Sequence, residues 1–330
     1  MIKLSLLILG VSVVLVGAGV TLAEPMCVAQ CDKLAEEGML AGNVSKEGCY
    51  VRVCQLEGRR FYESAEYAKA LESLDYLQAK LLNSPSYQMD RGLTLYALGR
   101  FEEALKCFER IQRGFPQNVK AGAQRAHTLV RLGRLDDGRA QFQQLLEQPE
   151  TSGEFKDLDT QSYLKGNIAI VKLMQGDLAG GKADLIRALE IDSRNKLAGT
   201  YLHNVVPFIE IGALDPEGVV ELVAAFEELG LRRLMPAAQK LQTLLNRQPL
   251  YAPGYQRLAE ILRSYQRYED CEKALRVGEA HLPSSINLRA ERLRCTLLRV
   301  GPSSDEAAPA VKELKQLAEA HPENERVKNP

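Results

Sequence analysis

A helix–turn–helix pattern recurs along most of the chain, and it limits the possible folds more than any other feature of the sequence. Its clearest copy lies within Leu173–Asn195, where the end of one predicted helix leads through a tight turn at Gly176-Asp177 into a second helix. The second helix carries small or apolar residues on one face: Gly181, Leu185 and Ala188. This stretch predicts a hairpin of two helices, and much of the remaining chain repeats it.

Another clear copy follows Pro85. The predicted first helix holds Gly92, the turn holds Gly99, and Pro116 follows the second helix. The inner face of that second helix is formed by Ala104, Phe108 and Ile111. Small residues let the two helices approach closely, and large ones fill the gap to the next unit. Proline ends the second helix because it cannot continue the hydrogen-bond ladder.

Further copies keep the same order of small, large and proline residues. They are marked by the pairs Phe142 and Pro149, Leu241 and Pro249, Leu275 and Pro283, and Leu317 and Pro322. The segment Lys196–Asp215 is less regular because Pro207 interrupts it, and we interpret it as a degenerate repeat or a bend.

The pattern resembles the tetratricopeptide repeat (TPR), a helix–turn–helix unit of about 34 residues. The resemblance implies an all-α fold, a TPR-like right-handed α-solenoid of about seven to eight helix–turn–helix repeats, with a concave groove lined by the first helices. We assign this array to residues 61–322 and a flexible tail to residues 323–330. An irregular helical bundle is the alternative.

The first 23 residues are interpreted as a targeting segment. No charge occurs between Lys3 and Glu24, and a run of roughly 20 residues is long enough to cross a bilayer. Small residues around Ala23 are typical of a signal-peptidase site. We expect a signal peptide over residues 1–23, with an uncleaved N-terminal membrane anchor or a core helix as alternatives. Either of the first two places the chain in an exported compartment: periplasmic, membrane-anchored facing the periplasm, or lumenal or secreted in a eukaryote.

Residues 24–60 are expected to form a cysteine-rich helical cap on the array. Cys27 and Cys31 are four residues apart and would share one helix face, and Cys49 and Cys54 form a second pair. Two short antiparallel helices would let Cys27 face Cys54 and Cys31 face Cys49. This resembles the nested disulfides of helical hairpins built on two CxxxC motifs, although the second spacing here is one residue longer. An oxidising compartment favours disulfides.

The cap has two other interpretations, and the connectivity of its cysteines stays open. A zinc site is disfavoured because such sites usually use CxxC-like spacing, which the sequence lacks. The second alternative interpretation is that the cap cysteines are free or redox-active thiols. Seven cysteines leave at least one unpaired in a monomer. For Cys107, Cys271 and Cys295 we expect small buried thiols, with a bridge between Cys271 and Cys295 as the alternative.

The sequence holds no recognisable catalytic or metal-binding motif. Its four histidines are scattered, and HExxH, GxSxG and P-loop patterns are missing. A net charge of -1 gives no broad attraction to nucleic acid or anionic lipid. We therefore predict no enzyme activity, no cofactor and no nucleic-acid partner, and expect contact with a membrane only through an uncleaved N-terminal segment.

Function is expected in the groove, as the binding of a protein or peptide partner by a non-catalytic scaffold. TPR geometry implies these groove residues: Met89, Leu93, Tyr96, Lys120, His127, Arg131, Tyr163, Asn167, Ile170 and Met174. As a set they predict an apolar groove with a basic patch in its first half, whereas each taken singly is more often an ordinary helix residue. The Lys and Asn clamp of chaperone-tail binders is not present.

Three functions remain open at this stage. Resemblance to exported bacterial TPR proteins implies a scaffold for envelope assembly, secretion or pilus biogenesis. A lumenal or periplasmic co-chaperone or thiol-linked assembly factor would use the cysteine cap as its active part. An enzyme would need a site hidden in the irregular segment 196–230.

Overall fold

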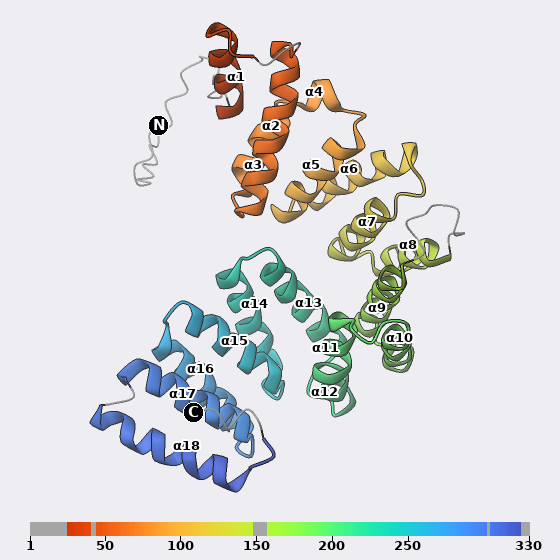
Figure 1. Ribbon diagram of the computed structural model, residues 1–330. Helices are drawn as coiled ribbons and strands as arrows, with labels where there is room; N and C mark the ends of the chain where they lie inside the picture. The colour runs from red at the N-terminus through yellow and green to blue at the C-terminus, as the bar shows by residue number, and fades with distance from the viewer. Residues whose placement is uncertain (1–24, 41–43, 148–156, 302–303, 325–330) are drawn as a thin grey trace, which may run out of the picture.

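The computed structural model describes residues 25–40, 44–147, 157–301 and 304–324, which form helices and turns without a strand (Figure 1). The helices are α1 (Met26–Glu36), α2 (Lys46–Glu63), α3 (Tyr67–Asp75), α4 (Gln78–Leu81), α5 (Pro85–Ala97), α6 (Phe101–Gly114), α7 (Val119–Arg131), α8 (Leu135–Glu147), α9 (Leu158–Met174), α10 (Leu178–Ile191), α11 (Lys196–Asn204), α12 (Val206–Glu210), α13 (Pro216–Gly230), α14 (Leu234–Arg247), α15 (Ala252–Ser264), α16 (Tyr268–His281), α17 (Ile286–Val300) and α18 (Ala308–Ala320), with a 3₁₀ turn at Asp305–Ala307. The predicted all-α, TPR-like solenoid is confirmed.

Two predicted segments lie wholly or partly outside the described residues. These are the targeting segment at residues 1–23 and most of the tail at 323–330, of which the structure describes 323–324. Among the described residues, none of the helices has both the length and the apolar character needed to span a membrane.

Successive helices pack as hairpins, and the turns explain the recurring glycines. α5 packs on α6, α7 on α8, and α9 on α10. The turns within these three hairpins hold Gly99, Gly133 and Gly176, at φ angles of 77°, 76° and 83°. Residues with a Cβ seldom adopt such angles, so glycine is the residue that lets the chain reverse there.

Side-chain caps mark the start of several helices. Ser84, Asn118, Asp177 and Asn195 each precede a helix, and each side chain accepts a hydrogen bond from the N–H three residues further on. Such a bond satisfies one of the N–H groups that a helix leaves unpaired at its first turn.

Close approach within a hairpin depends on small residues, as the pattern predicts. A Cβ added at Gly92 of α5 would lie 2.7 Å from the ring of Phe108 on α6. In the next-but-one hairpin, a Cβ at Gly181 would lie 2.6 Å from Leu173. Phe108 is fully buried, so a larger residue at Gly92 would have to displace a core ring.

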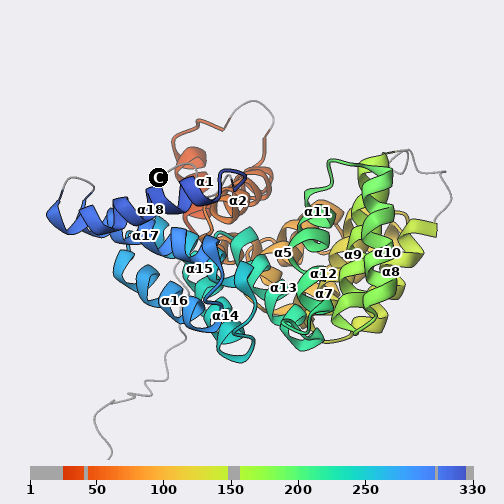
Figure 2. The same cartoon turned by 90° about the horizontal axis from the view of Figure 1, so that it is seen from below.

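The hairpins follow a curved path that brings distant parts of the chain together. In Figure 1 the turn between α2 and α3 faces the turn between α13 and α14. The perpendicular view in Figure 2 has α7–α12 at one side and α14–α18 at the other, with α13 between them. Tyr67 donates a hydrogen bond of 2.8 Å to the carbonyl oxygen of Leu231, and Arg232 donates one of 3.4 Å to that of Glu63.

The N-terminal cap is continuous with the array. Disulfides join Cys27 to Cys54 and Cys31 to Cys49, with Cα–Cα distances of 5.0 and 5.9 Å, which is the arrangement that two antiparallel helices were expected to allow. All four residues are buried. Because α2 extends to Glu63, the boundary expected between residues 60 and 61 falls inside a helix.

The irregular segment breaks where its proline suggested. α11 ends at Asn204 and α12 begins at Val206, with Pro207 in its first turn. Val205 and Val206 are nevertheless in the core, so the segment is a bend within the array and not a gap in it.

Candidate functional site: the inner surface of the solenoid

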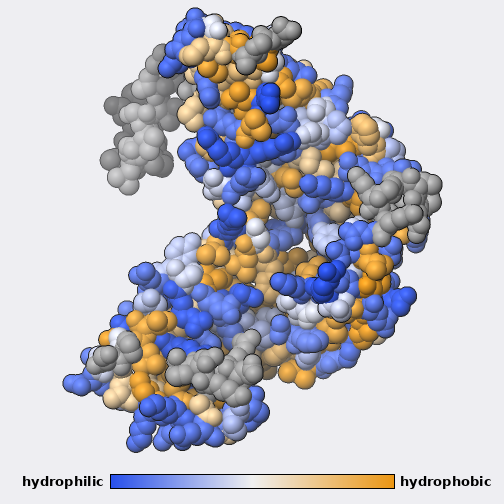
Figure 3. All heavy atoms as spheres, viewed as in Figure 1, coloured by the Kyte–Doolittle hydropathy of each residue, from blue (hydrophilic) through white to orange (hydrophobic). Residues whose placement is uncertain are grey.

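A mainly apolar cavity of about 190 Å³ lies on the inner side of the curve, between α7, α9, α11 and α13. Figure 3 shows the hollow between the two arms of the array and apolar residues along the lower arm, over α13 and α14. Four of the predicted groove residues line the cavity: His127, Asn167, Ile170 and Met174. Four of the ten predicted groove residues therefore border one small apolar cavity.

Helix periodicity explains the α9 wall. Asn167, Ile170 and Met174 are three and four residues apart and lie on one face of the helix. Each is only 6% exposed, because α13 packs against α9. The opposite wall is formed by Val223 and Phe226 of α13.

The polar groups at this cavity are paired within the chain. His127 Nε2 lies 2.5 Å from the hydroxyl oxygen of Tyr163, and its ring packs edge-on against Phe142 with centroids 5.1 Å apart. Burial lowers the pKa of His127 to about 4, so the imidazole is neutral at physiological pH. The side-chain amide of Asn167 donates to the Tyr163 carbonyl oxygen at 2.8 Å.

The predicted basic patch is not a free positive surface, and this corrects the expectation. The Arg131 guanidinium on α7 forms an ion pair with the Glu227 carboxylate on α13. Tyr96 on α5 donates a hydrogen bond of 2.9 Å to the same carboxylate. Burial raises the pKa of Glu227, and Arg131 opposes that rise. Of the predicted cations, only Lys120 is left exposed without an ion pair to the described part of the chain.

The other predicted groove residues do not line the cavity themselves. Met89, Leu93 and Tyr96 pack half-buried against the core cluster around Phe108. Tyr163 is 38% exposed and reaches the cavity only through its contact with His127.

The contribution of α13 was missed, although its sequence held a signal. Residues 217–230 have helical spacing, and apolar residues occur on more than one side of that helix: Val219, Val220, Leu222, Val223 and Phe226. A helix with so wide an apolar surface is expected to be covered on two sides. One side packs on α14, and the other reaches α9 and the cavity.

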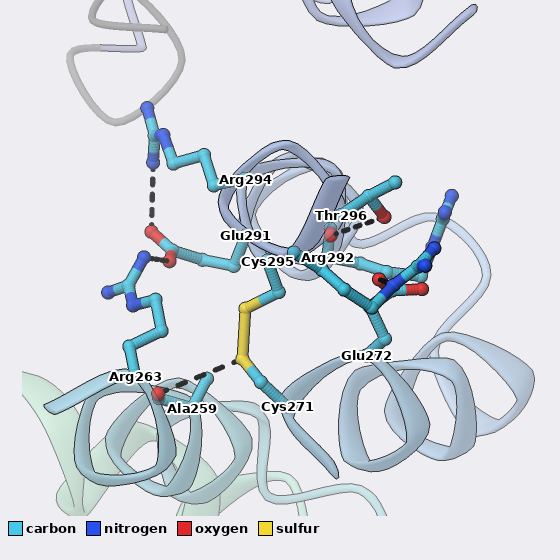
Figure 4. Close-up of a disulfide and its surroundings, with 10 residues drawn as sticks. Ala259, Arg263, Cys271, Glu272, Glu291, Arg292, Arg294, Cys295 and Thr296 are labelled. Atoms are coloured by element: carbon cyan, nitrogen blue, oxygen red, sulfur yellow. Dashed lines mark hydrogen bonds and ion pairs between the residues drawn. A yellow bond between two sulfur atoms is a disulfide. The ribbon is translucent and has the colours of Figure 1, made fainter. Parts of the chain in front are cut away.

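A third disulfide joins Cys271 on α16 to Cys295 on α17, where we expected buried thiols (Figure 4). The two helices pack side by side, which brings the Cα atoms to 6.1 Å, within the range of a disulfide. Nearby, Arg263 and Arg294 both bind the Glu291 carboxylate. Cys107 is buried and unpaired.

Two further features bear on chemistry. Within the described ranges there is no group of three His, Cys, Asp or Glu residues that could hold a metal ion. A second, separate hollow lies beside the irregular segment 196–230, where an enzyme site was considered. Its volume is about 60 Å³, and Thr200, Asn204 and Tyr251 border it.

Comparison with known proteins gives a family match over part of the chain and a set of similar folds. Residues 95–161 match the tetratricopeptide repeat family. No curated protein sequence matches the chain.

Solved structures of similar fold include a tetratricopeptide repeat protein from Parabacteroides merdae, at 15% identity over 84% of this chain and 96% of that one, with a TM-score of 0.39. PilW, described as a widely conserved type IV pilus biogenesis factor, has 15% identity over 79% of this chain and 97% of that one, with a TM-score of 0.40. PilF of Pseudomonas aeruginosa has 11% identity over 80% and 97%, with a TM-score of 0.40. At these values the likeness carries no inference about function.

Proposed function

We propose that this chain, whose residues 95–161 match the tetratricopeptide repeat family and whose helices form a TPR-like solenoid, is a non-catalytic scaffold. It binds a protein or peptide partner at its inner surface. Repeat solenoids use their curved inner faces as extended binding surfaces. The observation that carries the proposal is the apolar cavity between α7, α9, α11 and α13.

The size of the cavity favours one anchoring side chain over a small-molecule ligand. Pockets for drug-sized ligands usually enclose about 300–1,000 Å³, whereas this one encloses about 190 Å³. Its walls at Ile170, Met174 and Phe226 suit an aliphatic or aromatic residue of the partner. Buried apolar anchors of this kind supply most of the affinity in protein interfaces.

An exported compartment is part of the proposal. Three cysteine pairs support it, because disulfides are rare in reducing compartments. The uncharged segment at residues 4–23 supports it from the sequence. There the scaffold would serve envelope assembly, secretion or a similar process. The burial of all four cap cysteines favours a structural cap over a thiol-linked assembly factor.

The test fills the cavity without introducing a charge. Val223→Phe places a ring in the cavity, while Val220→Phe makes the same change on the same helix at a side chain that is 39% exposed. Partners are captured with the wild-type chain from its native compartment, identified by mass spectrometry, purified and titrated against each variant. We expect Val223→Phe to weaken binding at least tenfold with an unchanged circular dichroism spectrum, and Val220→Phe to bind normally. Equal affinity for wild type and Val223→Phe would refute the cavity as the site.

A further inference from the structure

Almost every arginine in the described part of the chain is bound to a carboxylate or a carbonyl of the chain itself. Arg125, Arg131, Arg263 and Arg299 illustrate this, each with an acidic partner on another helix. Within the described residues three arginines form no ion pair or hydrogen bond: Arg52, Arg110 and Arg113. The latter two are three residues apart on α6 and therefore lie on one side of the helix.

Arg110 and Arg113 line one cavity of about 380 Å³, between the loop that precedes α5 and the last turn of α6. Its apolar wall includes Leu82 and Phe115, whose exposed fractions are 39% and 53%. Two unpaired cations and two exposed apolar side chains thus surround the same hollow. The helix dipole favours a cation at Arg113, in the last turn of α6, but it gives no reason for Arg110 to lack a partner.

Gln88 adds a third kind of group to this cavity. It is 2% exposed and lies in the wall, where its side-chain N–H donates to the Leu82 carbonyl oxygen at 2.6 Å. Its Oε1 has no hydrogen-bond donor. Buried acceptors are nearly always satisfied, so an unsatisfied one at a cavity is a position where a bound ligand can supply the donor.

The hollow continues along the surface. Arg113 also borders a neighbouring depression of about 380 Å³, whose walls carry Gln112, Gln141 and Gln144. Glu109 is in the same wall, where its carboxylate is already paired with Arg125. Glutamine side chains can both donate to and accept from a peptide backbone. Two adjoining hollows that share Arg113 suit an extended peptide better than a single small anion.

We propose that these two hollows form a second binding site, distinct from the inner-surface cavity, for an extended acidic segment of a protein partner. A carboxylate of the segment pairs with Arg110 and Arg113, a neighbouring apolar side chain contacts Phe115, and a main-chain N–H donates to Gln88. No residue is shared with the lining of the inner-surface cavity. A flat anionic bilayer is disfavoured because the groups face a hollow and not a projecting surface.

The test uses an array of hexapeptides, each with two glutamates and one varied apolar residue, together with counterparts in which glutamine replaces glutamate. Tight-binding peptides are titrated against wild type, the double variant Arg110→Glu/Arg113→Glu, and Arg52→Glu. The last is the matched control, since Arg52 is also exposed and unpaired but lies on α2, outside the cavity. Sedimentation with phosphatidylglycerol vesicles tests the membrane alternative.

We expect acidic peptides to bind wild type and Arg52→Glu equally, and the double variant at least tenfold more weakly. Binding should also weaken as salt is added. The proposal fails if acidic peptides bind no better than their glutamine counterparts, if the double variant binds like wild type, or if only vesicles bind. Val223→Phe should leave peptide binding unchanged, so failure here is distinguishable from failure of the inner-surface proposal.

Discussion

Tyr67 donates a hydrogen bond of 2.8 Å to the carbonyl oxygen of Leu231, although 164 residues separate the two along the chain. Tyr67 is the first residue of α3, and Leu231 follows the last residue of α13. The Arg233 guanidinium lies over the same tyrosine ring, 5.1 Å from its centroid. In a simple solenoid each repeat contacts only its neighbours. This contact joins two repeats that are far apart in the chain, so it holds the array in a more strongly curved form than contacts between neighbours alone would require.

Removing the hydroxyl should weaken that contact. Tyr67→Phe loses the hydrogen bond to Leu231 while keeping the ring beneath Arg233, so we expect the free energy of unfolding to fall by about 1 kcal/mol. Urea denaturation followed by circular dichroism measures it. Tyr62→Phe is the control, because the Tyr62 ring packs on Tyr67 but its hydroxyl has no hydrogen-bond partner in the described residues. Equal effects of both substitutions would contradict the role of the hydrogen bond.

The pair Arg131–Glu227 should be sensitive to charge reversal. Both side chains are mostly buried, at 18% and 23% exposed, so Arg131→Glu places two carboxylates together. We expect a loss of about 2 kcal/mol in the free energy of unfolding. The exchanged pair Arg131→Glu/Glu227→Arg should recover much of it in the same denaturation assay. No recovery would show that the loss has another cause.

The contacts within a hairpin could be predicted from sequence, whereas those across the curve could not. Gly92 and Phe108 are close in the chain, and the demand for a small residue opposite a large one is visible as a recurring spacing. Arg131 and Glu227 are 96 residues apart, and their meeting depends on small rotations that add up over several repeats. These rotations leave no local pattern in the sequence, so Arg131 was predicted to belong to a basic patch of the groove.

The same reason explains the mixed outcome for the groove. The face of α9 that includes Ile170 and Met174, which TPR geometry implied for the groove, lines the inner-surface cavity. Helix α13, from a later repeat, packs over this face of α9. Only a small cavity therefore remains where an open groove was expected. The Cys271–Cys295 bridge likewise required the distance between α16 and α17, which spacing alone does not provide.

The pKa of His127 predicts a specific dependence of stability on pH. It is lowered from 6.5 to about 4 by burial, so between these pH values the folded chain binds fewer protons than the unfolded chain. The free energy of unfolding should therefore decrease as pH falls from 6.5 towards 4. His127→Gln should reduce that dependence in urea titrations at several pH values. The exposed His203→Gln is the control; an unchanged slope in His127→Gln would contradict the assignment.

The third disulfide should contribute measurably to stability. It closes a loop over a sequence separation of 24 residues, for which chain-entropy arguments give about 3 kcal/mol. Cys271→Ala/Cys295→Ala should lose that amount, and Cys107→Ala should lose less because Cys107 is unpaired. Alkylation of the unfolded, unreduced chain followed by mass spectrometry should modify Cys107 alone. Modification of any other cysteine would contradict the bridge that contains it.

α2 is a single helix of 18 residues, about 27 Å long. In its first half it carries Cys49 and Cys54, whose disulfides join it to α1. At its end the carbonyl oxygen of Glu63 accepts a hydrogen bond from Arg232, which follows α13. Because α2 is one continuous helix, it provides no hinge between the cap and this contact. A force that rotates the cap is therefore transmitted to the far arm of the array. Whatever holds the chain on the N-terminal side of Cys27 would orient both arms together.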